Sequence, residues 1–295
     1  MRAITLAIAA AAVTLFFWSS SYVAIRVGLQ SFEPGALGLA RYTIAGLVML
    51  IFYFFLRNKT KPNSKDLLLL FITGSVGIGL YNISLNAGEE QVTAALASFI
   101  ISMNPVVISL FALLFLKERM CWFGWIGILI SVIGMLTIFI AKSTGHAEIN
   151  TGVLHILLSV FCGSFYTLMQ KQLVQKFHPI EIVFWAIWFA VLVSLVYLPE
   201  FIHEYADVGT KEIIATIYLG VCPAAFGYLC WSYALKVLPV TKVSAGLFLL
   251  PLVTIILGWL ILRELPPSLA IVGGLISLCG AVLVFRQKVR QNPNP

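Results

Sequence analysis

Long apolar segments separated by short polar connections make up almost the whole chain. Several of these segments run for close to twenty residues without a charged side chain. Because a helix needs about 20 apolar residues to cross the hydrocarbon core of a bilayer, the pattern predicts ten transmembrane helices. We place them at residues 4–25, 35–56, 66–86, 93–116, 121–141, 152–172, 180–199, 211–234, 241–262 and 268–285.

The composition agrees with a protein that faces lipid. Hydrophobic residues make up 60% of the chain and charged residues only 11%, whereas a soluble domain carries about 25% charged residues. The mean hydropathy is +0.99. The predicted fold class is therefore an all-α membrane protein. The connections are too short for a soluble domain, and the polar tail RQKVRQNPNP is expected to be disordered.

The basic residues orient the predicted helices. With the N-terminus in the cytoplasm, most of the 19 Lys and Arg residues fall on cytoplasmic connections, and most acidic residues fall on the other side. Cytoplasmic connections of membrane proteins are enriched in this way. We therefore expect a multi-pass protein of the cytoplasmic (inner) membrane with both termini in the cytoplasm. The net charge of +7 then reflects topology, and nucleic acid is not an expected partner.

The N-terminal stretch FFWSSSYVAIR resembles the end of a cleavable signal peptide, because Arg2 and an alanine-rich apolar run precede it. Cleavage there would remove one of the ten helices and half of a matched pair. An uncleaved first transmembrane helix is therefore the favoured interpretation.

An internal repeat relates the two halves of the chain. The segments NPVVISLFALLFLKER and LPLVTIILGWLILREL place Pro105 and Pro251 at the same offset as Glu118 and Glu264, and WSSSYVAIR is echoed by GSFYTLMQK. Each repeat holds five predicted helices, so the second copy enters the membrane inverted. The predicted domains are residues 1–145 and 146–295. Inverted repeats are typical of secondary transporters, whose substrate site lies near the membrane midplane between the repeats.

These motifs also resemble a known family. WSSSYVAIR in the first helix, LARYTIAG in the second, and a proline followed thirteen residues later by glutamate in the fourth and ninth are similar to the EamA-type family of the drug/metabolite transporter superfamily. The resemblance implies a central cavity lined by helices from both halves, with the fifth and tenth helices packed outside it. Family members move amino acids, other small metabolites, drugs or nucleotide-sugars.

We therefore expect a secondary transporter, not an enzyme, that moves a small polar metabolite by alternating access. An amino acid or related amine is the favoured substrate, and the resemblance favours export. A nucleotide-sugar or drug carrier of the same fold is the alternative. A membrane-embedded enzyme is disfavoured because the chain lacks the G-x-S-G and H-E-x-x-H motifs and intramembrane aspartates.

Polar and aromatic side chains inside the predicted helices are the candidates for substrate binding. The serines also fit close helix packing, the asparagines also fit hydrogen bonds between helices, and Trp231 also fits a lipid-facing position. The candidates are Trp18, Ser19, Ser21, Tyr22, Tyr81, Asn82, Asn86, Ser98, Ser102, Tyr166, Tyr228 and Trp231.

A second group is expected to act in gating or structure. A charge inside a span is costly unless it is paired, so Arg41 is expected to form a salt bridge with Glu33, Glu89 or Glu90. A substrate carboxylate is the alternative partner for Arg41. Proline kinks helices and can act as a hinge, and glutamates at helix ends can cap turns. The group comprises Arg41, Pro105, Pro251, Glu118 and Glu264.

Other kinds of site are not expected. The five cysteines are widely spaced and the four histidines scattered, so neither a disulfide framework nor a metal site is predicted. The chain has no P-loop, and we expect no cofactor. No Asp or Glu is expected deep inside a span, which disfavours a midplane proton relay. The small residues Gly127, Ser131, Gly273 and Ser277 fit packing of the fifth helix on the tenth, or a homodimer contact.

Overall fold

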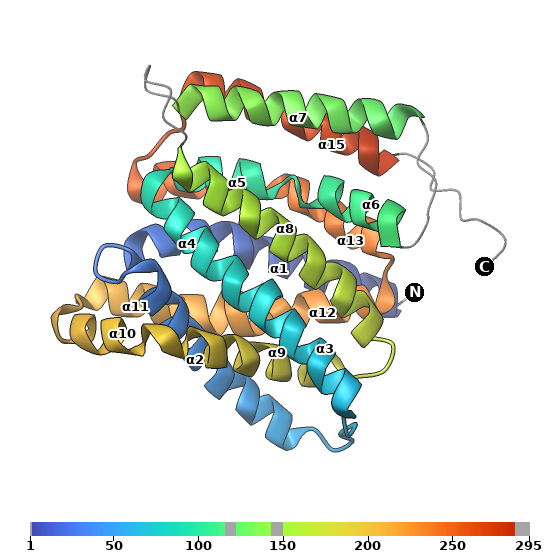
Figure 1. Cartoon of the computed structure of the whole chain (residues 1–295), viewed down its shortest axis with the longest axis vertical. Coiled ribbons are helices and arrows are strands. Elements are labelled where there is room, and N and C mark those ends of the chain that lie inside the picture. Colours follow the sequence, from blue (N-terminus) through green and yellow to red (C-terminus); the bar gives the residue numbers. More distant parts are fainter. Residues whose placement is uncertain (1, 116–121, 143–149, 287–295) are drawn as a thin grey trace.

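The structure, a computed structural model, describes residues 2–115, 122–142 and 150–286. Within these residues every regular element is helical (Figure 1). Each of the ten predicted spans coincides with one helix or with a run of consecutive helical segments. The protein is an all-α membrane protein whose spans form two inverted five-span halves. Five spans are single helices: α1 (Arg2–Gly28), α2 (Pro34–Phe55), α7 (Trp122–Lys142), α8 (Thr151–Leu173) and α15 (Ser268–Arg286).

The other five spans are interrupted. They consist of α3 (Ser64–Gly74), η1 (Ser75–Leu80) and α4 (Tyr81–Gln91); α5 (Ala94–Ile101) and α6 (Asn104–Phe115); α9 (Pro179–Ser194), η2 (Leu195–Tyr197), α10 (Leu198–Glu204) and η3 (Tyr205–Asp207); α11 (Thr210–Leu219), η4 (Gly220–Gly227) and α12 (Tyr228–Val237); and α13 (Val240–Ser244), η5 (Ala245–Leu249), α14 (Leu250–Leu257) and η6 (Gly258–Leu262).

The lengths and surfaces of these helices suit a bilayer. Seven of the described helices are long and apolar enough to cross a membrane, and shorter apolar stretches lie at Trp122–Gly134, Gly246–Leu262 and Ile271–Gly280. Large apolar side chains point away from the protein, for example Phe54 and Phe55, each about three-quarters exposed. A protein in water rarely leaves such residues exposed side by side, whereas lipid tails solvate them.

Helix starts follow ordinary capping chemistry. Asn63 and Asp66 form a capping box at α3, and His178 and Glu181 form one at α9. His178 Nδ1 accepts a hydrogen bond from the Ile180 amide, which requires a neutral imidazole. Burial and the nearby Lys236 both lower the pKa of His178 and keep it in that form.

Interruptions of the third and fourth spans of each half occur at equivalent places. The π-helical segments η1 and η4 both lie in the middle of the third span of their half. The fourth span breaks at Ser102–Met103, and Pro105 is the second residue of the helix that follows. The ninth span has η5 at the equivalent position, and Pro251 again follows it. Both expected proline sites therefore lie at real breaks in the helices.

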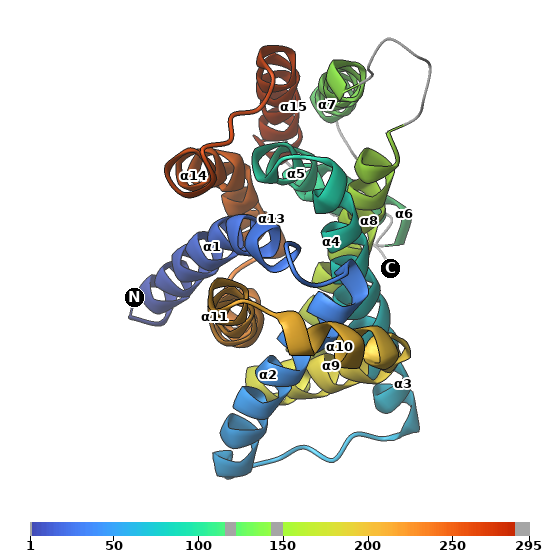
Figure 2. The same ribbon diagram turned by 90° about the vertical axis from the view of Figure 1, so that its left-hand side faces the viewer.

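The fifth and tenth spans, α7 and α15, pack along each other outside the other helices (Figure 2). A side chain added at Gly134 would meet the backbone of Gly273 and Ser277, and one added at Gly280 would meet the backbone of Gly127 and Ser131. Ser131 Oγ also donates a hydrogen bond to the Ser277 carbonyl, 3.1 Å away. The small-residue ladders thus join the two halves within one chain.

Candidate functional site

A small cavity lies between the two halves, near the middle of the helices. Its volume is about 40 Å³, which is enough for a few water molecules. Both halves contribute to its wall, from α1, α2, η1, α4, α5, α6, α8, α12, η5 and α14. The lining residues are Trp18, Ser21, Tyr22, Arg41, Gly77, Tyr81, Asn82, Leu85, Ile101, Asn104, Gly163, Tyr166, Thr167, Tyr228, Leu247 and Leu250.

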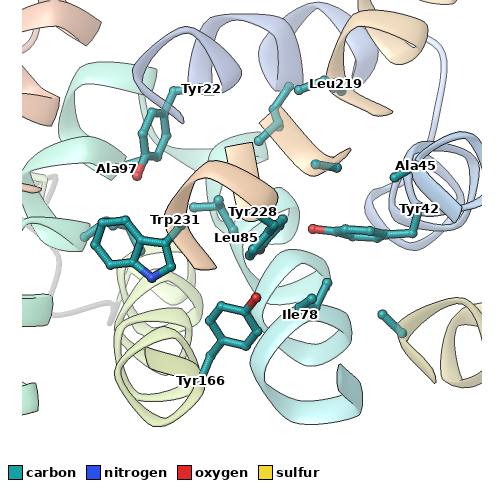
Figure 3. Close-up of a cluster of buried hydrophobic side chains, with 14 of the residues drawn as sticks. Tyr22, Tyr42, Ala45, Ile78, Leu85, Ala97, Tyr166, Leu219, Tyr228 and Trp231 are labelled. Atoms are coloured by element: carbon teal, nitrogen blue, oxygen red, sulfur yellow. The ribbon is translucent and has the colours of Figure 1, made fainter. Parts of the chain in front are cut away.

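Aromatic rings form one continuous cluster beside this cavity. The Tyr228 ring lies 5.4 Å from Trp18 and 5.3 Å from Tyr166, in edge-to-face arrangements. Trp231 lies 4.9 Å from Trp18 on the other side. Figure 3 shows Tyr228 between Tyr166 and Tyr42, whose hydroxyl points toward it. Ring faces carry negative potential, so such a cluster favours an ammonium or another cation.

The cavity also contains a guanidinium. Arg41, on α2, is only 3% exposed, and its Nη1 donates a 2.9 Å hydrogen bond to Asn82 Oδ1. Asn82 Nδ2 in turn donates to the Ile78 carbonyl, which fixes the amide so that its oxygen faces Arg41. Arg41 Nε has no hydrogen-bond partner in the structure.

Arg41 does not have the acidic partner expected from the sequence. Within the described ranges the ion pairs are Arg26–Glu264 and Lys176–Asp66, and Arg41 belongs to neither. Its hydrogen-bond partner is a neutral amide, so the guanidinium keeps its positive charge and part of its donor capacity for another group. The site is therefore suited to an anionic group such as a carboxylate.

Trp18 connects the first span to the π-helical segment η4. Its indole Nε1 donates to the Pro223 carbonyl, and one turn earlier Thr14 Oγ1 donates to the Gly227 carbonyl. These two hydrogen bonds hold α1 against η4 at the edge of the cavity.

The sequence-based candidates separate into two groups. The cavity is lined by Trp18, Ser21, Tyr22, Tyr81, Asn82, Tyr166 and Tyr228. The others are buried elsewhere. Ser98 and Ser102 donate to carbonyls of their own helix, and Asn86 donates to the Pro34 carbonyl. Ser19 contributes its carbonyl to Thr254. Trp231 is fully buried behind Trp18 and does not face lipid.

Two polar residues of the site, Asn104 and Thr167, were not predicted from the sequence. Asn104 lines the cavity, and its side-chain oxygen accepts a 3.0 Å hydrogen bond from Ser164. Thr167 lines it on the opposite half. An amide directly before a proline inside a span was the available signal for Asn104, because an amide in lipid needs a partner.

One end of the molecule, which we call the Arg26 end, is closed by contacts of Arg26. Its Nη2 lies 3.0 Å from Glu264 Oε1, and its Nη1 donates to the Glu89 carbonyl at 2.6 Å. The sequence predicted that Glu264 caps a turn. In the structure Glu264 instead pairs with Arg26 across the two halves. Glu118, its repeat equivalent, lies outside the described residues.

The opposite end, which we call the Lys171 end, is closed by a related contact. Lys171 Nζ donates to the carbonyls of Leu235 and Leu238, at 2.6 and 3.0 Å. Arg26 and Lys171 are equivalent in the two repeats, and so are Glu89 and Leu235. In each half, therefore, a cation at the end of the first span binds a backbone carbonyl, and the two carbonyls occupy equivalent positions in the repeats.

The structure buries one acidic residue, Glu89, that the sequence placed just beyond the end of the third predicted span. This residue belongs to α4, within the apolar helical run Ser64–Gln91, and its side chain is 0% exposed. Neither of its carboxyl oxygens has a hydrogen-bond partner in the structure.

Comparison with known proteins gives matches over nearly the whole chain. The EamA-like transporter family matches residues 5–140 and again residues 150–286. A relative named "Probable terminal-alkyne amino-acid exporter", from Streptantibioticus cattleyicolor, is 33% identical over 95% of this chain and 94% of its own. The "Uncharacterized transporter YdfC" of Bacillus subtilis is 29% identical, over 93% of this chain and 89% of its own.

The fold also matches a solved crystal structure with a TM-score of 0.67 and 18% identity, covering 94% of this chain and 96% of that one. At this identity the match speaks for the fold alone.

Proposed function

The chain belongs to the EamA-like transporter family, whose members are membrane transporters and not enzymes, and we propose that it moves amino acids by alternating access. We further propose that it lies in the cytoplasmic membrane with both termini in the cytoplasm, so that the Arg26 end faces outward, and that it works as an exporter.

The observation that carries the proposal is the lone Arg41 guanidinium in an aromatic-walled cavity. An α-amino acid presents a carboxylate and an ammonium a few ångströms apart. Arg41 is suited to the carboxylate, and the ring faces around Tyr228 and Trp18 are suited to the ammonium. The name of the Streptantibioticus relative, an amino-acid exporter, supports the same substrate class.

Alternating access is supported by the two closed ends. Each end is held by a few contacts of a single cation, Arg26 or Lys171. The helix breaks before Pro105 and Pro251 adjoin the cavity at equivalent places in the two halves. Opening at one end with closure at the other would expose the same cavity to either side of the membrane.

Transport by purified protein in liposomes tests this function. We expect entry of labelled amino acids above that of protein-free vesicles, whatever the orientation of the protein. A panel of nucleotide-sugars and amphiphilic drugs should show no such excess. Amino-acid entry indistinguishable from that of empty vesicles across a broad panel would overturn the proposal.

The role of Arg41 is tested by paired substrates. Arg41→Gln keeps polarity and approximate length but removes the charge, so it should reduce transport of an amino acid such as leucine at least about 10-fold, the effect of losing a charge-assisted hydrogen bond. Transport of the matching amine without the carboxylate, 3-methylbutylamine, should fall much less. Equal losses for both compounds would remove Arg41 from carboxylate recognition.

A further inference from the structure

The buried carboxyl group of Glu89 has no role in the cavity. Its side chain is fully buried near the end of α4, and both oxygens lack a hydrogen-bond partner. An ionised carboxylate held in this way would lose its hydration without gaining a hydrogen bond in return, which is unfavourable. A protonated carboxyl group is neutral and suffers a far smaller penalty. The closed Arg26 end is therefore suited to Glu89 in its protonated form.

The charged and titratable groups around Glu89 come from several elements. Electrostatic interactions reach it from Arg26 and Tyr22 on α1, Arg41 on α2, Tyr81 on α4 itself, and Glu264 in the segment after η6. On the described part of α5 no residue is titratable. On α8 the nearest histidine, His155, is exposed and acts on Glu90 instead. Two cations and one competing carboxylate thus decide the charge of Glu89.

Arg26 links this carboxyl group to closure of the end. In the closed structure its Nη2 binds Glu264, its Nη1 binds the backbone carbonyl of Glu89, and its Nε has no partner. The Arg26 guanidinium is therefore already at Glu89 but holds the main chain instead of the carboxyl group. The Glu264 carboxylate, about a quarter exposed, can return to water when the pair separates.

From this arrangement we propose that Glu89 is a proton-binding site that couples opening of the Arg26 end to release of one proton. On opening, the Arg26–Glu264 ion pair separates and water reaches Glu89. The O–H bond of its carboxyl group breaks, the proton passes to that water, and the carboxylate pairs with Arg26. On closing, the carboxylate takes up one proton and Arg26 returns to Glu264. The total charge is conserved in both directions.

The sign of the pH effect follows directly. The closed state holds one more proton than the open state, so lowering the pH favours closure and raising it favours opening. A difference of one bound proton changes the ratio of closed to open molecules up to tenfold per pH unit.

The distance across the Arg26 end measures this equilibrium without any substrate. Spin labels at Gln30 and Leu265, both exposed, would be placed in the full chain with its cysteines replaced by serine, in lipid nanodiscs between pH 5 and 9. We expect a short-distance population that grows as the pH falls. Glu89→Gln, which mimics the protonated carboxyl group, should stay in the short-distance population at every pH.

Two further variants complete the test. Glu90→Gln changes the neighbouring exposed carboxylate and should keep the parent protein's pH dependence. Glu264→Gln, at a partly exposed site outside the helices, removes the competitor for Arg26 and should move the transition to lower pH. The proposal is overturned if the parent protein shows no pH-dependent change, if Glu89→Gln keeps one, or if Glu264→Gln leaves the transition in place. None of these results depends on which substrate the protein carries.

Discussion

The two halves of the molecule share their framework but differ where they face the cavity. Gly134 and Gly280 make the same backbone contacts on α7 and α15, and Arg26 and Lys171 bind carbonyls at equivalent positions. These contacts hold helices together in both halves. The residues that make them lie at equivalent positions of the two repeats.

The cavity wall follows a different rule. Arg41 in the first half has Ala186 as its repeat equivalent, and Asn104 has Leu250. Asn82 and Tyr228 are also equivalent, and they lie in contact, with Asn82 Nδ2 3.4 Å from the Tyr228 hydroxyl. The first half therefore supplies the charge and the amides of the cavity wall, whereas aromatic and apolar groups come from both halves.

This difference has a physical explanation. Two access states of similar energy need a framework that is nearly symmetric, because each half must be able to take the packing of the other. An amino acid is not symmetric, so its carboxylate and ammonium need different groups on the two sides. Residues that break the repeat inside the cavity are therefore the ones we expect to set specificity.

The strongest test of the polar wall is Asn82→Leu. The variant removes the oxygen that fixes Arg41, and a hydrogen bond to a charged group contributes about 1.5–3 kcal/mol. Amino-acid transport in liposomes should fall roughly 10- to 100-fold while the protein still inserts and elutes as one species. Transport within twofold of the parent protein would show that Arg41 does not depend on this partner.

The symmetric framework is tested by Gly134→Ala and Gly280→Ala. Each added methyl group would come within 2.5 Å of backbone atoms of the opposite helix, and overpacking of this kind costs about 1–3 kcal/mol. Both variants should lower the melting temperature in detergent by similar amounts. Gly258→Ala is the control, because nothing lies within 4 Å of its added carbon. A large loss at only one of the two positions would contradict the shared framework.

Most of the fold was predictable because lipid imposes it. The bilayer fixes helix length, so apolar runs reveal the spans, and the offset between Pro105 and Pro251 reveals the repeat. The π-helical segments η1 and η4 were not predictable. Hydrogen-bond partners in other spans, such as Trp18 for the Pro223 carbonyl, accompany them, and a periodic pattern does not contain such partners.

The site was predictable only in part. Trp18, Tyr22, Asn82 and Tyr228 stood out because polar or aromatic groups are unusual inside spans. The sequence could not distinguish Ser98 from a residue that lines the cavity. Helical periodicity shows on which face of a helix a side chain lies, but it does not show that the Ser98 hydroxyl bonds to a carbonyl of its own helix. The burial of Glu89 was not predictable either. Its place near a span end indicated contact with water, but packing of α1, α2 and α8 on α4 buries it.

The variants Arg26→Met and Lys171→Met test which cation keeps each end closed. Each variant keeps much of the apolar stem and removes hydrogen bonds that are worth about 1 kcal/mol at partly exposed sites. In a Glu89→Gln background, where Arg26 gains no carboxylate partner on opening, Arg26→Met should shift the population toward opening at the Arg26 end, and Lys171→Met toward opening at the Lys171 end, each by roughly fivefold. Spin-label distances across both ends measure the shifts. Opening at the same end in both variants would contradict the assignment of one cation to each end.

The smallest expected effect belongs to Tyr228→Phe. Its hydroxyl accepts a long 3.4 Å contact from Asn82, and contacts of that length are weak. The ring contacts with Trp18 and Tyr166 remain. Because we assign Tyr228 an aromatic role, transport should stay within about twofold of the parent protein, whereas Tyr228→Leu should lower it clearly. A loss of transport in Tyr228→Phe as large as that in Asn82→Leu would show that both halves take part in polar recognition. It would contradict the assignment of polar recognition to the first half.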